Sequence, residues 1–347
     1  MAKLGLFFTR GVSLKTWEKV GNLDREIKPY QKLLSYFDEI YFFTYDKKIH
    51  KPSLYNIVVL GASVFRKELK NIDVYKTNQM NGSWKAVIAK KLYSKKLVVR
   101  QGYQWSIFAR NKKVAYWKQL LISLIERFAY KNADAIMVSS KADIDYIIEK
   151  YKTDSNKIYY MPNYVDTELF KPMNIPNQDK RGRICTVAKL EKQKNLENLI
   201  EAVRPLDIEL IIIGSGSLKD RLKSLAPSNV KIIENIPNNK LPEEINKSQL
   251  FILPSHFEGC PKALLEAMSC GVPVIGTKVP GIDEIIKHKE NGYLCDISIE
   301  SIRMAIKEVL SDEELRGKIS LNGRKTILEN FSLDKLIEKE KEIYKNL

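Results

Sequence analysis

Residues 253–275 read LPSHFEGCPKALLEAMSCGVPVI, and this stretch decides the fold class. It joins two apolar runs, 250–253 and 273–275, through a loop that contains Gly259 and a segment of helical periodicity that begins near Lys262. Short apolar runs of this kind are typical of strands that are buried on both faces. A strand, a helix and a second strand in this order predict a βαβ unit of a parallel sheet.

Two acidic residues flank the start of this predicted helix. Glu258 lies in the loop before it, and Glu266 lies in its first two turns. Ligands of open α/β sheets bind at the carboxyl ends of the strands, where a helix N-terminus offers N–H groups and partial positive charge to a phosphate. Because carboxylates accept hydrogen bonds from sugar hydroxyls, the spacing favours a sugar and a ribose on either side of a diphosphate. Either residue alone is more simply interpreted as a surface or helix-capping glutamate.

The same alternation of strands and helices continues along the chain. The 347 residues are 44% apolar, and a chain of this length favours two domains. Apolar runs alternate with stretches of helical periodicity, which predicts the α/β class with doubly wound parallel sheets. Residues 170–182 contain prolines and asparagines without periodicity, as linkers do. We therefore expect a first domain over residues 1–170, a second over 180–330 and an amphipathic helix over 332–347.

Cysteine and histidine are too scarce to suggest a zinc site. The chain has four cysteines, all in its second half and without a C-x-x-C pair, and three histidines. Free thiols fit a reducing cytoplasm. No apolar stretch approaches the roughly 18 residues that span a bilayer, and the apolar run at 4–8 is too short for the core of a signal peptide. We therefore expect a cytoplasmic protein.

The formal net charge of +16 is unevenly distributed. Residues 1–170 hold 30 Lys and Arg against 16 Asp and Glu, whereas residues 171–347 hold 28 against 26. Within residues 84–131, twelve cations accompany a single acid, Glu126, and aromatic residues are interleaved with them. This composition suits an anionic membrane surface or nucleic acid, and a solvated lysine face over core aromatics is the plain alternative. We favour peripheral association with the inner face of the cell membrane and expect no nucleic-acid partner.

The stretch from Glu258 to Glu266 resembles the donor signature of glycosyltransferase family 4, in which seven residues separate two glutamates. The resemblance implies a GT-B fold, with two Rossmann-like domains facing an interdomain cleft. It also implies that Glu258 contacts the transferred sugar and Glu266 the ribose hydroxyls. Pro261 has no N–H, so one backbone hydrogen-bond donor is missing. The resemblance implies that the nucleotide sugar binds along the backbone of Gly259, Cys260, Pro261, Lys262 and Ala263.

Two lysines match cationic positions of the same family. Lys189 and Lys194 lie where members carry Arg and then Lys. Cations placed there stabilise the negative charge of a departing nucleoside diphosphate more strongly in the transition state than in the ground state. Lys189 offers a point charge where the usual Arg offers a bidentate fork. In a chain this rich in lysine, each is otherwise a solvated surface charge.

Glycines mark further points of resemblance. Gly214 and Gly216 follow an apolar run but lack the third glycine of a dinucleotide fingerprint, so they match instead the turn that lies near the nucleotide in family members. Ile236 falls where members hold the base through backbone atoms. Gly11 stands in place of the glycine pair that follows the first strand. The family's late Gly-x-x-Glu corresponds to residues 281–284. Residues 332–347 resemble the family's tail helix, which implies that they cross back to the first domain.

The acceptor side is less well marked. The resemblance is dense over residues 130–347 and sparse over 1–130. Members often carry a histidine near the end of a strand in the middle of the first domain, where this chain has Arg100 and Gln101. We expect these two side chains to face the acceptor. No catalytic base is assigned.

Taken together, these features and the resemblance predict transfer of a sugar from a UDP- or GDP-sugar to a glycan or lipid-linked acceptor, without a cofactor. Retention of the anomeric configuration is what the resemblance implies. Asp143 and Asp145 form a D-x-D string, but they lie in helical context and diverge, so no metal is expected. An NAD-dependent oxidoreductase would share the alternating pattern. Another GT-B enzyme, such as an epimerase, and a nucleotide-sugar-binding protein without turnover are further alternatives.

Overall fold

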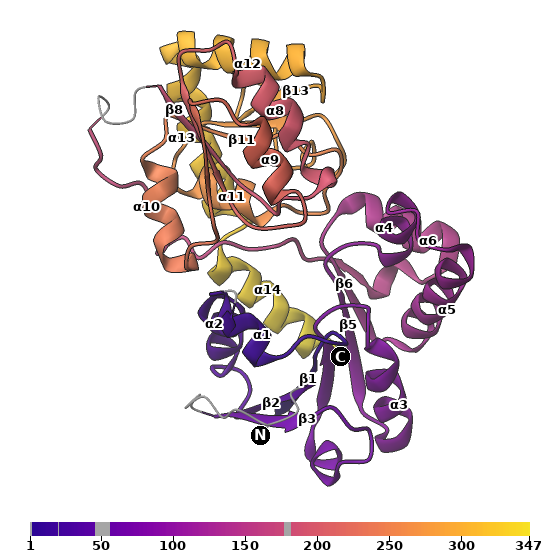
Figure 1. Cartoon of the computed structure of the whole chain (residues 1–347). Coiled ribbons are helices and arrows are strands. Elements are labelled where there is room, and N and C mark those ends of the chain that lie inside the picture. Colours follow the sequence, from indigo (N-terminus) through magenta and orange to yellow (C-terminus); the bar gives the residue numbers. More distant parts are fainter. Residues whose placement is uncertain (1, 20, 46–55, 177–181) are drawn as a thin grey trace. The chain divides into compact units, whose positions relative to one another are not determined.

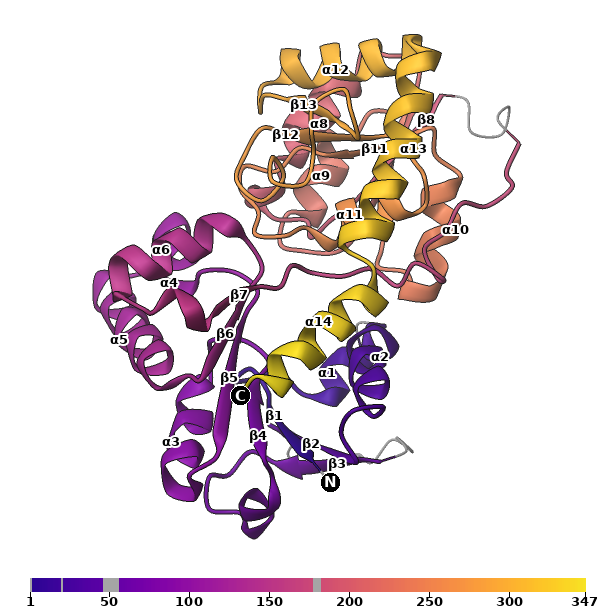
Figure 2. The same cartoon turned by 180° about the vertical axis from the view of Figure 1, so that it is seen from behind.

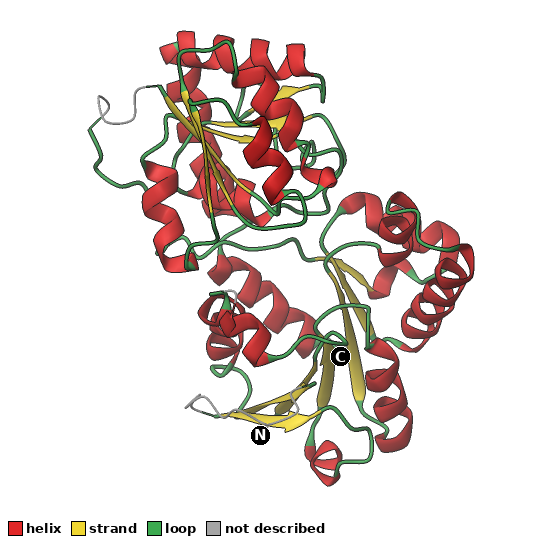
Figure 3. Ribbon diagram, viewed as in Figure 1, coloured by secondary structure: helices red, strands yellow, loops and turns green. Residues whose placement is uncertain are grey.

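Two parallel sheets organise the chain, each within its own unit (Figures 1 and 3). The structure is a computed structural model that describes residues 2–19, 21–45, 56–176 and 182–347. Unit 1 comprises Met1–Pro162 and Ile337–Leu347, and unit 2 comprises Asn163–Leu336. The predicted fold class, two parallel-sheet α/β domains, is confirmed.

The sheet of unit 1 has the strand order β3-β2-β1-β4-β5-β6-β7, and its neighbouring strands pair in parallel. Its strands are β1 (Lys3–Phe7), β2 (Glu39–Thr44), β3 (Ile57–Gly61), β4 (Val74–Thr77), β5 (Lys96–Gln101), β6 (Ala135–Val138) and β7 (Ile158–Tyr160). Its helices are α1 (Leu14–Lys19), α2 (Leu23–Leu33), α3 (Ser83–Tyr93), α4 (Trp105–Asn111), α5 (Tyr116–Asn132) and α6 (Lys141–Tyr151), with short 3-10 turns η1 (Lys67–Asn71) and η2 (Ser155–Lys157).

Successive side chains of these strands point to opposite faces of the sheet. Phe7 and Phe43 stack on the face that α3, α5 and α6 cover. Phe42 contacts Tyr30 of α2 on the other face. The strands are therefore apolar on both sides, which explains why they read as continuous apolar runs.

The last helix, α14 (Leu333–Lys345), ends in unit 1. Lys76 of β4 donates to Glu340 Oε1 at 2.5 Å, and Tyr344 donates to the same atom at 2.5 Å. Burial lowers the pKa of Lys76, which the nearby Glu340 carboxylate partly offsets. This buried pair fixes the end of the chain to the sheet of unit 1.

The sheet of unit 2 has the order β10-β9-β8-β11-β12-β13 and is also parallel (Figure 2). Its strands are β8 (Arg183–Val187), β9 (Glu209–Ile213), β10 (Val230–Ile233), β11 (Leu250–Leu253), β12 (Val274–Thr277) and β13 (Tyr293–Cys295). Its helices are α8 (Leu196–Val203), α9 (Lys219–Leu225), α10 (Leu241–Asn246), α11 (Lys262–Ser269), α12 (Ile299–Ser311) and α13 (Glu313–Asn330), with 3-10 turns η3 (Lys192–Lys194) and η4 (Asn238–Lys240). One core lies between the sheet and α8, α9 and α12, and a second between the sheet and α10, α11 and part of α13.

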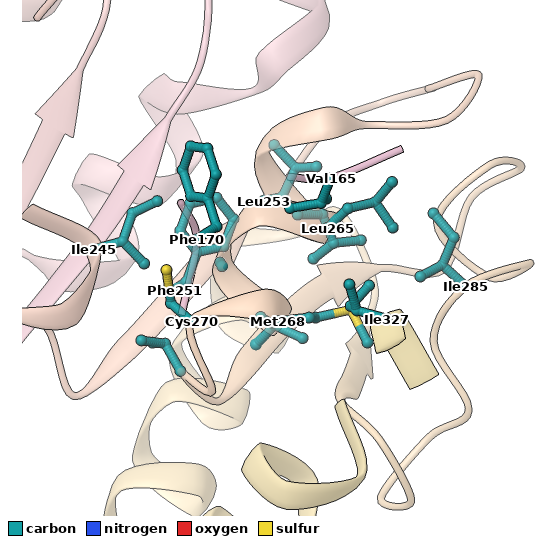
Figure 4. Packing of buried hydrophobic residues seen from close by; sticks show 14 of the residues in the cluster. Val165, Phe170, Ile245, Phe251, Leu253, Leu265, Met268, Cys270, Ile285 and Ile327 are labelled. Carbon is teal, nitrogen blue, oxygen red and sulfur yellow. The ribbon is translucent and has the colours of Figure 1, made fainter. Parts of the chain in front are cut away.

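The units divide earlier than the sequence predicted, between Pro162 and Asn163 instead of near residue 170. Phe170 is 1% exposed and belongs to the core beside α11 (Figure 4). Ser269 donates to the carbonyl oxygen of Phe170 at 2.6 Å. Residues 163–170 therefore pack as part of unit 2, a long-range effect that the local composition does not reveal.

The predicted linker also differs from the structure, and the final helix spans the boundary between the units. Met173 donates its backbone N–H to Asn246 Oδ1 at 2.8 Å, so this part of the linker is fixed to unit 2. Residues 177–181 of the predicted linker lie outside the described residues. Within α14, residues up to Leu336 belong to unit 2 and those from Ile337 belong to unit 1.

Phe170→Ala should therefore destabilise unit 2 by about 3–5 kcal/mol, the usual cost of a large cavity in a core. All four tryptophans lie in unit 1, so their fluorescence follows unit 1 and far-UV circular dichroism follows both units. In urea, the circular dichroism transition should shift to lower concentration more than the fluorescence transition does. Leu321→Ala, at a side chain that is 73% exposed, is the control and should change neither by more than about 0.5 kcal/mol.

Candidate functional site

The strand order of unit 2 reverses between β8 and β11. Chain order runs outward from β8 through β9 to β10 on one side, and from β11 through β12 to β13 on the other. The loops that follow β8 and β11 therefore leave the sheet in opposite directions at its carboxyl edge. Open α/β sheets bind their ligands at such a point.

An ion pair joins these two loops. Lys194 Nζ lies 2.5 Å from Glu258 Oε1, and Ser255 Oγ donates to the same oxygen at 2.6 Å. The side chains of Lys194 and Glu258 are only 17% and 8% exposed. Among the described residues, the contacts found for the Glu258 carboxylate use Oε1, which leaves Oε2 as an acceptor.

Backbone contacts hold the two loops in register. Gln193 donates its side-chain amide to the carbonyl oxygen of Phe257 at 2.8 Å and accepts from the backbone N–H of His256 at 2.8 Å. Thr277, at the end of β12, donates to the carbonyl oxygen of Ser255 at 2.6 Å. The position of Glu258 is thus set from three neighbouring strand ends.

Gly281 supports the loop that carries Glu258. Its φ of +83° lies in the left-handed region, which side chains rarely adopt. A Cβ at this position would overlap the carbonyl oxygen of Gly259 and lie 2.6 Å from that of Glu258. The glycine in the late Gly-x-x-Glu pattern is therefore required by close backbone packing beneath the loop.

The start of α11 adjoins this loop, as the sequence predicted. The helix begins at Lys262, and its first N–H groups have no acceptor within the helix. Asn163 donates its side-chain amide to the carbonyl oxygen of Cys260 at 2.6 Å, and its backbone N–H lies 3.3 Å from Cys260 Sγ. Lys262 Nζ lies 5.0 Å from the centre of the Tyr164 ring. Residues 163–164 therefore brace the turn that presents these N–H groups.

The second glutamate is more deeply placed than the first. Glu266 lies on α11 and is 4% exposed, and the partly exposed residues Lys262 and Ala263 lie one turn before it. Burial raises the pKa of the Cys270 thiol to about 12, with a smaller contribution from the Glu266 carboxylate. Cys270 is therefore a protonated core residue. Contact between Glu266 and a ribose remains a prediction.

The glycine pair after β9 packs on the loop after β8. A Cβ on Gly214, whose φ is +156°, would overlap the Ala188 carbonyl oxygen, and a Cβ on Gly216 would overlap that of Leu190. Leu190 donates to Ser215 O at 3.0 Å. Close contact between the two loops explains why both positions are glycine. A contact with the nucleotide-sugar donor is not needed to explain them.

Lys189 lies on this same loop and is exposed. Among the described residues it forms no ion pair, in contrast to Lys194, whose charge is compensated by Glu258. Ile236 is partly buried and packs against the core beside α11. The two lysines that sequence analysis treated alike therefore have different electrostatic environments.

The residues predicted on the acceptor side lie in unit 1. Gly11 follows β1 with a φ of +82° and open space around it. The Arg100 guanidinium donates to the carbonyl oxygen of Met161 at 2.6 Å. Gln101 is fully buried beside Gln104 and Tyr130, so the expectation that it faces an acceptor is wrong. A buried amide at the end of a strand resembles an exposed one in sequence.

Unit 1 also has a point where its strand order reverses, between β1 and β4. Asn78 lies there and donates to Thr9 Oγ1 at 3.3 Å, and Arg10 donates its backbone N–H to the carbonyl oxygen of Asn81 at 3.1 Å. Sequence analysis missed residues 78–81, because they match no motif. Their place after a buried strand was the only available signal.

Hollows open at both edges of the unit 2 sheet. One of about 540 Å³ lies at the carboxyl edge and is lined by residues that include Lys192, Asn195 and His256. A larger one of about 1330 Å³ lies at the opposite edge, before the strands, where Asp207, Glu209 and Glu313 accompany Lys231 and Arg316. The C-terminal end of α11 lies at the larger hollow. Its carbonyl groups carry partial negative charge, which disfavours an anionic ligand there. Size alone therefore does not identify the site.

The described residues include no group of three or more His, Cys, Asp or Glu side chains that could hold a metal ion. Asp143 is buried in the first turn of α6 and Asp145 is exposed, so the D-x-D string diverges as predicted. None of the helices in the described ranges combines the length and apolar character of a bilayer span.

Two protein-family models match the chain. The model described as Glycosyl transferases group 1 matches residues 168–326, and the model described as Glycosyltransferase Family 4 matches residues 37–169. The second match begins at residue 37, so the resemblance over the first 130 residues is stronger than the motifs alone indicated.

Individual proteins agree with these matches. The UDP-Gal:alpha-D-GlcNAc-diphosphoundecaprenol alpha-1,3-galactosyltransferase of Escherichia coli is 28% identical over 248 residues, which cover 65% of this chain and 64% of that protein. The N-acetyl-alpha-D-glucosaminyl L-malate synthase of Bacillus anthracis is 28% identical over 236 residues, which cover 63% and 61%. The matches thus span a little under two thirds of these relatives.

A solved structure shows the same fold. The HepE protein of Anabaena in complex with UDP superposes with a TM-score of 0.81 at 17% identity, and the match covers 100% of both chains. The chain therefore belongs to glycosyltransferase family 4 and has the GT-B fold, with two parallel-sheet α/β domains.

Gly281→Ala should destabilise the protein by about 1–3 kcal/mol, because the backbone is strained and the loop carrying Glu258 must move. Gly317→Ala is the matched control. Its Cβ would meet nothing within 4 Å, and in a helix interior it should be neutral or stabilise by about 0.5–1 kcal/mol. Thermal unfolding distinguishes the two, and equal stability of both variants would contradict the packing described for Gly281.

Proposed function

We propose that this chain transfers a sugar from a UDP- or GDP-sugar to a glycan or lipid-linked acceptor, with retention of the anomeric configuration. The reaction would serve the synthesis of a cell-surface polysaccharide or glycolipid. Family membership supports sugar transfer in general, and the galactosyltransferase relative carries a diphosphoundecaprenol acceptor in its name. The HepE protein, which has the same fold, was solved in complex with UDP, and this supports a nucleotide ligand in general.

The observation that carries the proposal is the geometry where the strand order of unit 2 reverses. Glu258 is held through Oε1 by Lys194 and Ser255, so Oε2 can accept a hydrogen bond from a sugar hydroxyl without further ordering. The first N–H groups of α11 lie four residues further on and offer donors to a diphosphate. A fixed hydrogen-bond acceptor beside a helix N-terminus matches the transferred sugar and the adjoining diphosphate of a nucleotide sugar.

Charge on the leaving group needs an uncompensated cation. Lys189 is exposed and, within the described part of the chain, unpaired, so we assign it to the diphosphate. Lys194 contributes less net charge, because Glu258 neutralises it, and its main role is to position that carboxylate. Cations and helix N–H groups can take the part of a metal ion, so the proposed reaction needs neither metal nor cofactor.

Glu258→Gln should lower kcat by roughly 100-fold or more, because the side chain loses its charge and its ion pair with Lys194. Glu266→Ala should instead raise the Kd for the nucleotide by roughly tenfold, as expected from the loss of a hydrogen bond to a charged group. Steady-state kinetics and calorimetry with a UDP-sugar measure the two effects. Glu290→Gln, at an exposed residue, is the control. If both site variants bind and turn over like the parent, the assigned roles are wrong.

A panel of UDP-, GDP- and ADP-sugars tests the donor class. A cognate donor at 100 times its Kd should add about 2.7 kcal/mol of apparent stability, visible as a rise in Tm. Hydrolysis of that donor without acceptor separates an enzyme from a binding protein.

The transferase activity should survive treatment with EDTA. Loss of activity that Mg²⁺ or Mn²⁺ restores would contradict the metal-independent mechanism.

A further inference from the structure

Helix α5 is apolar on two opposite faces. Its inner face packs in unit 1 through residues such as Ile122 and Ala129, which are 7% and 0% exposed. The other face carries large apolar side chains that remain in solvent. At about 100° per residue these point away from the inner face. They are Tyr116, Trp117, Leu120, Leu121 and Leu124, with exposed fractions of 74%, 63%, 50%, 51% and 64%.

This apolar face is unusual for a protein surface that faces water alone. Single exposed hydrophobic residues are common, but five on one helix face form a contiguous stripe. Figures 1 and 2 show α5 on the outside of the helix layer of unit 1. Burying the stripe would remove apolar area from water without disturbing the core beneath it.

The surface charges of the segment that contains the stripe have one sign. Residues 84–131, all of which the structure describes, contain one acid, Glu126, which is fully buried. Its carboxylate accepts from the backbone N–H of Ser106 at 2.9 Å and from the Tyr151 hydroxyl at 2.5 Å. The charged side chains on the surface of this segment are therefore all cationic. The exposed ones are Lys91, Lys96, Arg110, Lys112, Lys113, Lys118, Arg127 and Lys131.

The chemistry of the stripe discriminates among partners. Nucleic acid would use aromatic rings for stacking, but three of the five exposed residues are leucines, which do not stack on bases. Leucines and a tryptophan, flanked by lysines and arginines, suit the boundary between headgroups and acyl chains of an anionic bilayer. Lys118 Nζ lies 5.2 Å from the Trp117 ring centre, so its charge stays close to the apolar side chain.

We propose that the outer face of α5, with the basic residues 110–113 before it, docks unit 1 on a bilayer rich in anionic phospholipid. The apolar stripe enters the headgroup region and the cations pair with lipid phosphates. This inference rests on the proposed function in one respect: it brings the enzyme to the surface on which a lipid-linked acceptor resides.

Vesicle flotation tests the proposal with the full chain. The parent should float with vesicles rich in phosphatidylglycerol, and roughly tenfold more weakly with vesicles of phosphatidylcholine alone. The triple variant Trp117→Ser, Leu121→Ser, Leu124→Ser should bind the anionic vesicles at least roughly tenfold more weakly than the parent does. The triple variant Lys112→Glu, Lys113→Glu, Lys118→Glu should do the same, and salt should weaken binding of the parent.

Matched controls come from unit 2. The triple variant Met304→Ser, Leu321→Ser, Leu328→Ser changes side chains that are 69%, 73% and 42% exposed, and should float like the parent. The triple variant Lys307→Glu, Lys318→Glu, Lys325→Glu makes the same change in net charge at exposed positions and should also float like the parent.

Three results would overturn the proposal. The parent could fail to float with anionic vesicles, or the α5 variants could float as well as the controls. Alternatively, sedimentation could show a dimer that the serine variant dissociates while no vesicle binding occurs, which would assign the stripe to a second copy of the chain. Donor hydrolysis by the α5 variants should stay at the parental rate. Lost flotation of the α5 variants with intact hydrolysis therefore supports docking, and it does so independently of the proposed function.

Discussion

The ion pair between Lys194 and Glu258 is the constraint on which the site depends. It connects loops from two strands at the point where the strand order of unit 2 reverses, and it is largely shielded from water. Removing one partner of a buried pair typically costs about 3–5 kcal/mol, because the remaining charge is left unpaired. The hydrogen bond from Ser255 to the same carboxylate oxygen reduces the freedom of Glu258 further. A site of this kind is organised before any ligand arrives.

The fold follows from local pattern, whereas the support of the site does not. The run of apolar strands and the helix beginning at Lys262 were predictable, because each depends on a few consecutive residues. Glu258 was selected as a candidate from its spacing to Glu266, and its role stays a prediction. The contact of Asn163 with Cys260 joins residues 97 positions apart, and no spacing rule reveals it. The same holds for Phe170, whose burial moves the boundary between the units.

Sequence analysis also treated residues alike that the structure separates. Lys189 and Lys194 matched one motif, but only Lys194 lies against a carboxylate. Arg100 and Gln101 are neighbours on β5, and Gln101 points into the core because successive strand residues face opposite sides. Gly214 matched a nucleotide-binding turn, and its lack of a side chain is already explained by the loop beneath it. Motif positions therefore give candidates, and packing decides what each one does.

Crystallography of the chain with an intact UDP- or GDP-sugar, whichever binds, tests the central claim most directly. The account predicts electron density for the diphosphate at the first turn of α11, within hydrogen-bonding reach of the N–H groups of residues 262–264. Density for the sugar should lie against Glu258 Oε2. A nucleotide bound at the opposite edge of the sheet, in the hollow beside Asp207 and Glu209, would contradict it.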